Sequence, residues 1–117
     1  MAATAPEVVV VDGRFNGPPG SANGGYACGV LGARVDAPAA EVTLRLPVPL
    51  DVPLAVEPQD GGHLALRHGA GLIAEARPID LVDVAPPVRP TFAQAQAAST
   101  RYPGHVPAAH PLPPCFV

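Results

Sequence analysis

The chain has 117 residues and a formal net charge of −3, and 48% of its residues are apolar while only 4% are aromatic. This length fits one domain with an aliphatic core, and the seven basic residues, all arginines, are too few and too scattered for a surface that binds nucleic acid. No apolar run approaches the ~20 residues that cross a bilayer, and the N-terminal residues lack a signal-peptide pattern. The two cysteines, Cys28 and Cys115, lie far apart in the sequence, which favours free thiols over a disulfide bond. We therefore expect a cytoplasmic protein.

Prolines and glycines, 17 and 12 in number, are spread unevenly along the chain. The prolines crowd the sequence after Ala85, whereas the preceding residues keep a readable hydrophobic periodicity. We therefore predict an ordered body over 1–85 and an irregular, proline-rich tail over 86–117.

A strand and a loop are the first predicted elements. Glu7–Phe15 is rich in β-branched residues and contains the turn dipeptide Asp12-Gly13 near its end, which is typical of a strand. Asn16–Ala22 follows with prolines and glycines that do not fit regular structure. We expect a long loop there.

A helix is predicted next, over Gly24–Val35. Apart from Arg34, its residues are small or apolar on every side. Such a pattern indicates a buried helix. Asn23 is a favourable N-cap residue, and Ser21 is a second candidate.

Glu41–Glu57 begins with apolar and polar residues in alternation, the period of a strand. Pro47, Pro49 and Pro53 interrupt it, and proline cannot donate to a strand ladder. The segment is therefore expected to bend, to bulge or to run along the edge of a sheet.

Two short alternating runs, Leu64–Arg67 and Leu72–Arg77, flank a turn with glycines and predict a hairpin. Thr91–Tyr102, rich in alanine and glutamine, predicts a short helix. The order of a strand, a helix and three antiparallel strands fits the α+β class. A single apolar helix must be covered on most sides, so we expect the sheet to curl around it with the help of a second subunit.

Four stretches of this chain together resemble the hot-dog-fold acyl-CoA thioesterase-like proteins of high-GC bacteria. They are FNGPPGSANGGYACGVLG, EVTLRLPVPLDVPLAVE, LIAEARP and the terminal HPLPPCFV, in which NGGY and RLPVPLDVPL are the most specific parts. The resemblance implies a curved antiparallel sheet wrapped around one central apolar helix. It also implies a homodimer that acts on, or binds, acyl thioesters of coenzyme A or acyl carrier protein without a resident cofactor.

This chain departs from that family in two ways. In similar sequences the terminal HPLPPCFV tends to continue into further sheet. One interpretation is therefore that this chain is a fragment of a longer protein. Many hot-dog thioesterases carry an acidic residue on the central helix or opposite it, and Gly24–Val35 contains no acid. This second departure weakens the case for hydrolysis and leaves thioester binding intact.

Two consecutive glycines, Gly24 and Gly25, stand at the start of the predicted helix. A helix N-terminus presents unpaired N–H groups and a positive dipole, and glycine lets a ligand oxygen approach the backbone closely. We therefore predict that Asn23, Gly24 and Gly25 polarise a thioester carbonyl, with Tyr26 and Phe15 contacting the substrate. Close packing of small residues against the sheet is the alternative explanation for these glycines.

A hydrolase would also need a general base. The candidates are the acids and histidines of the body: Asp12, Asp36, Asp51, Glu75, His63 and His68. We favour Asp51, because the apolar residues around it would raise its pKa if they buried it, although a turn aspartate that caps backbone N–H groups fits the same sequence. No cluster of ligands indicates a metal site, and Cys28 is expected to be a buried, inert thiol.

Two functions are therefore open. One is an acyl thioester hydrolase-like protein that polarises the carbonyl at the helix start. The alternative is a non-catalytic acyl-CoA-binding or assembly module with the same fold.

Overall fold

The computed structural model describes residues 6–81 and 83–103, which belong to two compact units divided after Leu81. We call residues 6–81 the body and residues 83–103 the C-terminal segment. Cys115 and the HPLPPCFV stretch lie outside the described residues.

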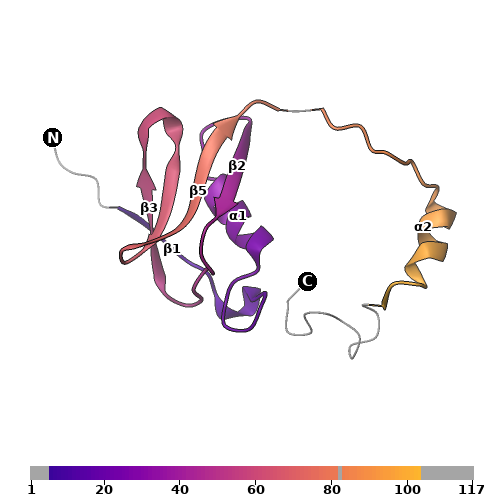
Figure 1. Cartoon of the computed structure of the whole chain (residues 1–117), viewed down its shortest axis with the longest axis horizontal. Helices are drawn as coiled ribbons and strands as arrows, with labels where there is room; N and C mark the ends of the chain where they lie inside the picture. The colour runs from indigo at the N-terminus through magenta and orange to yellow at the C-terminus, as the bar shows by residue number, and fades with distance from the viewer. Residues whose placement is uncertain (1–5, 82, 104–117) are drawn as a thin grey trace. The chain divides into compact units, whose positions relative to one another are not determined.

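The body is built on an antiparallel sheet of five strands in the order β1-β3-β4-β5-β2 (Figure 1). Helix α1 (Gly24–Gly32) follows the first strand, and the other four strands follow α1. The α+β class is therefore confirmed. The strands are β1 (Glu7–Val10), β2 (Ala39–Leu44), β3 (Pro53–Pro58), β4 (Leu64–His68) and β5 (Gly71–Ile79).

The predicted single strand over Glu41–Glu57 is two strands. β2 pairs with β5 at one edge of the sheet, whereas β3 pairs with β1 and β4 near the other edge. Residues 45–52, which we call the proline loop, connect β2 to β3. Pro47 and Pro49 lie within it, and their missing N–H groups explain why the ladder stops.

The predicted hairpin is confirmed. β4 and β5 pair from Leu64↔Ala76 to His68↔Gly71, with a register shift at Leu66/Arg67. Gly69, in the turn, has a φ of +58°, a conformation that glycine adopts without steric cost.

The first predicted strand is shorter than expected. β1 ends at Val10, and a 3₁₀ turn, η1 (Gly13–Phe15), follows Asp12. Asp12 is the N-cap of η1, because its carboxylate accepts a hydrogen bond from the N–H of Arg14. A second 3₁₀ turn, η2 (Asp60–Gly62), joins β3 to β4.

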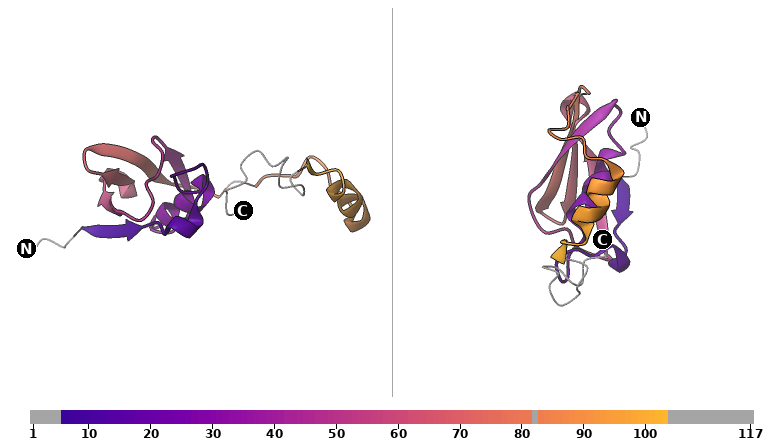
Figure 2. Two further views of the ribbon diagram at one scale, coloured as in Figure 1. Left: turned by 90° about the horizontal axis from the view of Figure 1, so that it is seen from below. Right: turned by 90° about the vertical axis from the view of Figure 1, so that its right-hand side faces the viewer.

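One face of the sheet, the inner face, carries the core. Its strands contribute buried aliphatic side chains, and α1 packs on this face beside β2 and β5 through Ala27 and Leu31 (Figures 1 and 2). Residues outside the strands and α1 complete the core. The buried strand residues on this face include Val9, Leu54, Val56, Leu66, Ala74 and Ala76, and those from the connecting segments are Val11, Ala22, Val35 and Val48.

α1 is less enclosed than the expected sheet wrapped around it would make it, because one side of the helix is open in this single chain. Gly25, Gly29 and Ala33 are exposed on the side of α1 that faces away from the sheet. The helix also ends at Gly32, with Ala33 as its C-cap, three residues before the predicted end. An all-apolar sequence indicates burial but not which sides a neighbour covers, so the sequence could not reveal this open side.

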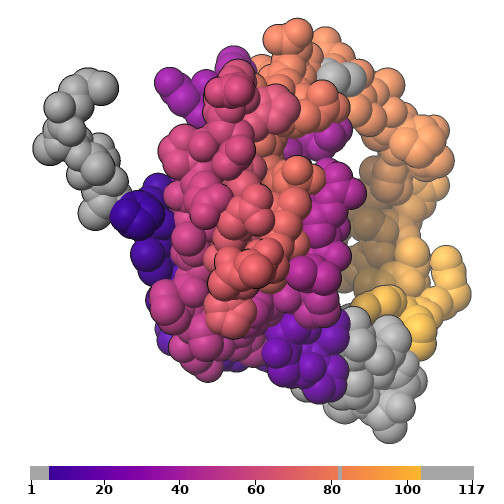
Figure 3. Space-filling view, turned by 60° about the vertical axis from the view of Figure 1, so that its left-hand side comes forward, coloured from indigo at the N-terminus to yellow at the C-terminus, as the bar shows by residue number. Residues whose placement is uncertain are grey.

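The opposite, outer face of the sheet carries the charged side chains, although Val8 and Val10 of β1 are exposed apolar residues on it. Arginines there form ion pairs with glutamates of neighbouring strands, including Arg77–Glu41 at 2.8 Å. The hydrogen bond and positive charge of Arg77 lower the pKa of the Glu41 carboxyl. What this exposed pair adds to stability is therefore present at neutral pH and is lost as the pH falls through that lowered pKa. The other pairs are Arg45–Glu75 and Arg67–Glu57. Figure 3 shows the atoms of β3, β4 and β5 packed side by side at the surface of the body.

The C-terminal segment contains the predicted helix, as α2 (Phe92–Ser99). Thr91 and Gln94 form a capping box, in which each side chain accepts a hydrogen bond from the backbone N–H of the other residue. Every described residue of this segment is exposed, so it has no core of its own in the described range.

Replacing Leu54 tests the core. Its side chain is 0% exposed, so Leu54→Ala is expected to lower the free energy of unfolding by about 2–5 kcal/mol. Chemical denaturation followed by circular dichroism measures this change. The control is Val8→Ala on the outer face, where Val8 is 52% exposed and the cost should stay near 0.5 kcal/mol; equal losses would contradict the assignment of the inner face.

Candidate functional site

The site is framed by two loops that are bonded to each other. One is the segment 11–23, which leads into α1, and the other is the proline loop. The N–H of Ala22 donates to the carbonyl of Val48 at 2.9 Å, and the N–H of Asp51 donates to the carbonyl of Val11 at 2.8 Å. These bonds hold the proline loop beside the start of α1.

Asn23 caps α1, as predicted. Its Oδ1 accepts a hydrogen bond from the N–H of Tyr26 at 3.0 Å, and its carbonyl accepts from the N–H of Ala27 at 3.0 Å. The N–H of Asn23 donates to the carbonyl of Phe15 at 2.8 Å, which fixes the residue in place. Ser21, the second candidate for this role, instead donates from Oγ to the carbonyl of Pro18.

Gly24 and Gly25 are the first two residues of α1. Their N–H groups have no hydrogen-bond acceptor among the residues that the structure describes. Gly25 is exposed and Gly24 is half-buried. The start of α1 therefore offers two adjacent donors and the positive end of the helix dipole.

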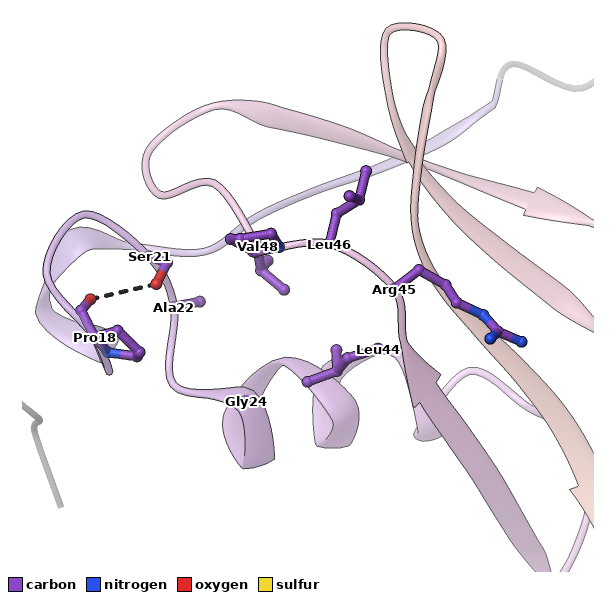
Figure 4. Close-up of a pocket in the computed structure, with 9 residues that line it drawn as sticks. Pro18, Ser21, Ala22, Gly24, Leu44, Arg45, Leu46 and Val48 are labelled. Atoms are coloured by element: carbon purple, nitrogen blue, oxygen red, sulfur yellow. Dashed lines mark hydrogen bonds between the residues drawn. The ribbon is translucent and has the colours of Figure 1, made fainter.

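Gly24 also lines an apolar pocket of about 400 Å³ (Figure 4). In the figure the side chains of Leu44 and Val48 point into the space above Gly24, whereas Arg45 points away from it. A Cβ added to Gly24 would lie 3.1 Å from Cδ1 of Leu44, so glycine keeps this side of the helix start open. The lining residues are Pro18, Ser21, Ala22, Gly24 and Leu44 through Val48.

Phe15 and Tyr26 contact each other beside the helix start. Their rings are stacked, with centroids 4.0 Å apart and planes at 12°, and both pack against the core. The Arg14 guanidinium carbon lies 4.6 Å from the centroid of the Phe15 ring, a cation–π contact. Neither aromatic is among the described residues that line the pocket of Gly24, so the structure places them as neighbours of the site rather than as its wall.

Asp51, the favoured base, is exposed and bonded to the backbone. Its Oδ1 accepts a hydrogen bond from the N–H of Gly13 at 2.7 Å. This is the alternative that the sequence left open, an aspartate that caps a backbone N–H group. Asp51 is not among the described residues lining the pocket.

Titratable side chains at the pocket are few. Arg45 is the one ionisable residue among its described lining residues, and its guanidinium bonds Glu75 on the outer face. Elsewhere in the described ranges, no group of three or more His, Cys, Asp or Glu residues could hold a metal ion. His63 and His68, the candidate bases of the hairpin, are exposed.

The pocket lining that comes from the proline loop is not predicted by the sequence pattern. Leu46 and Val48 fall within the single predicted strand, whereas in the structure the loop that carries them turns back to the start of α1. The usable signal was the pair Pro47 and Pro49, which interrupts the strand between apolar residues.

None of the helices in the described part of the chain combines the length and the apolar character needed to cross a bilayer. In comparisons with family models, curated proteins and solved structures, no match to this chain was found.

Cys28 lies on α1 and is half-buried. Burial raises the pKa of its thiol, so less of the reactive thiolate is present near pH 8. We expect iodoacetamide to alkylate Cys28 several-fold more slowly in the folded protein than in protein unfolded by guanidinium, as measured by mass spectrometry of the peptide that contains Cys28. Equal rates in the two states would contradict the inert thiol.

Proposed function

We propose that this chain binds acyl thioesters, with the acyl chain in the pocket of Gly24 and the thioester carbonyl at the start of α1. The observation that carries the proposal is the juxtaposition of an apolar pocket with two N–H groups that have no acceptor among the described residues. An acyl thioester has the same two parts side by side, an apolar chain and a polar carbonyl.

The chemistry of the pocket supports this match. Its volume of about 400 Å³ lies in the range of small-molecule sites, which are mostly apolar with a few polar groups that orient the ligand. Gly24 supplies one such N–H group from the pocket lining, and Gly25 supplies a second from the neighbouring position of α1, outside that lining. The helix dipole adds a favourable interaction with the partial negative charge of a carbonyl oxygen.

Hydrolysis is the second candidate. The same two donors would stabilise the oxyanion that forms when water attacks the thioester, and one such donor contributes roughly 3–4 kcal/mol in hydrolases. A base must activate the water, but the described lining residues include no Asp, Glu or His. We therefore place binding first and hydrolysis second, with the base supplied from outside this lining.

A hot-dog architecture completes the proposal. In it the open side of α1 is covered by a second copy of the chain, and the two copies form a homodimer. The exposed residues Gly25, Gly29 and Ala33 support this arrangement, because they allow another backbone to approach closely. The edge strand β2 lies next to α1 and adds unpaired backbone groups in the described part of the sheet.

Gly24→Val tests the binding site. The added side chain meets Leu44 and enters the pocket, so we expect affinity for acyl-CoAs to fall roughly tenfold or more. Isothermal titration calorimetry with saturated acyl-CoAs from butanoyl to hexadecanoyl measures affinity, and thiol release separates binding from hydrolysis.

Ala70→Val is the control for this variant. It adds apolar bulk at an exposed position in the β4–β5 turn, away from the pocket lining and from the open side of α1, so acyl-CoA affinity should be unchanged. A Gly24→Val variant that binds like the wild type, or a wild type that binds no chain length, would refute the proposed function.

Gly29→Arg tests the homodimer. An arginine on the open side of α1 should turn a wild-type dimer into a monomer, because the long charged side chain would keep the two copies apart. Light scattering at micromolar concentration reports the mass, and Ala70→Arg, at an exposed position in the β4–β5 turn, should leave the dimer intact. A monomeric wild type would exclude this arrangement.

A further inference from the structure

Asp51 occupies an unusual backbone conformation. Its φ is +59°, and among the described residues it is the one non-glycine with a positive φ. Aspartate tolerates this region better than most residues because its short side chain can bond locally. Such a conformation persists only where the surrounding contacts hold it.

Asp51 ties the proline loop to η1 through two hydrogen bonds. Its own N–H donates to the carbonyl of Val11 at 2.8 Å, and its carboxylate accepts from the N–H of Gly13 at 2.7 Å. The second bond has a carboxylate acceptor, and its 2.7 Å length is in the range of charge-assisted hydrogen bonds.

All three N–H groups of η1 have acceptors. Arg14 donates to the carboxylate of Asp12 at 2.9 Å, and Phe15 donates to the carbonyl of Asp12 at 3.0 Å. Both of these bonds are local. Gly13 alone depends on a distant residue, Asp51, so this carboxylate fixes where η1 begins relative to the proline loop.

The position of η1 determines the position of the start of α1, because the two elements are in direct contact. Phe15, its last residue, accepts the hydrogen bond from the N–H of Asn23 at 2.8 Å and stacks its ring on Tyr26. Asn23 and Tyr26 are in turn joined by the capping bond. A shift of η1 therefore moves the residues on both sides of Gly24 and Gly25.

We infer that Asp51 is a positioning residue, which through Gly13 and Phe15 fixes the start of α1 beside the proline loop. It does not touch the proposed ligand, because it lies outside the pocket lining among the described residues. The inference rests on the proposed function only in that the positioned groups are the proposed donors to the thioester carbonyl.

Gly13, the donor to the Asp51 carboxylate, also supports the inference. A Cβ added there would lie 2.7 Å from Oδ2 of Asp51, closer than side chains pack in proteins. The backbone of η1 thus approaches the carboxylate as closely as glycine allows. Gly13 and Asp51 should consequently behave as a coupled pair.

The test compares Asp51→Asn, which keeps a side-chain oxygen acceptor and tolerates the positive φ, with Asp51→Gly, which keeps the φ and loses the acceptor. We expect Asp51→Asn to change acyl-CoA affinity by less than about twofold and Asp51→Gly to lower it by about fivefold or more. Asp80→Ala, at an exposed aspartate after β5 and outside these contacts, should have no effect. Equal losses in both Asp51 variants, or no loss in Asp51→Gly, would overturn the inference.

A measurement without ligand separates this inference from the proposed function. In ¹H–¹⁵N spectra, the amide resonances of Gly24, Gly25 and Tyr26 should move in Asp51→Gly and stay in place in Asp51→Asn. If the wild type binds no acyl-CoA, the proposed function fails while these shifts still decide the role of Asp51. Unmoved resonances in Asp51→Gly would refute it.

The coupling to Gly13 gives a second, independent variant. Gly13→Ala should displace the same three amide resonances in the wild-type background. In the Asp51→Gly background the added methyl group has no carboxylate to meet, so its additional effect should be much smaller. Equal effects of Gly13→Ala in both backgrounds would show that Asp51 and η1 are not coupled, and the inference would fall.

Discussion

A nine-residue helix must cover the inner face of a five-stranded sheet, and the rest of the body follows from that constraint. α1 buries only Ala27 and Leu31, so the connecting segments supply the missing apolar cover. Val11 and Val48, from the two loops, are 1% and 3% exposed. Because their side chains belong to the core, both loops are held in place, and the pocket between them has defined walls.

The start of α1 lies where the packed core meets the proposed binding site. Asn23 satisfies the N–H of Tyr26, which leaves the N–H groups of Gly24 and Gly25 as the donors without an acceptor in the described chain. The N–H of Asn23 in turn donates to the carbonyl of Phe15, which fixes the position of the cap. The proposed binding site rests on this arrangement, in which a cap held by hydrogen bonds leaves two donors beside an apolar pocket.

Sequence patterns predicted the elements that depend on neighbouring residues. The hairpin, the Asn23 cap and the existence of a helix within Thr91–Tyr102 all rest on local chemistry, and each is confirmed, although the helix spans only Phe92–Ser99. The return of the proline loop to α1 depends on contacts between residues far apart in sequence, which periodicity does not encode. For the same reason the open side of α1 and the bond between Asp51 and Gly13 could not be predicted from the sequence, although an aspartate as a backbone cap was one of the two alternatives.

The three ion pairs of the outer face limit how copies of this body can assemble. Each pair joins side chains that are roughly half exposed to water, on Arg45–Glu75, Arg67–Glu57 and Arg77–Glu41. Stacking another apolar layer on that face would remove six charged groups from solvent, and such desolvation is seldom repaid by the pairing itself. The charged groups thus disfavour a sandwich built on this face, and in the proposed homodimer the contact between copies lies on the helix side or at the sheet margins.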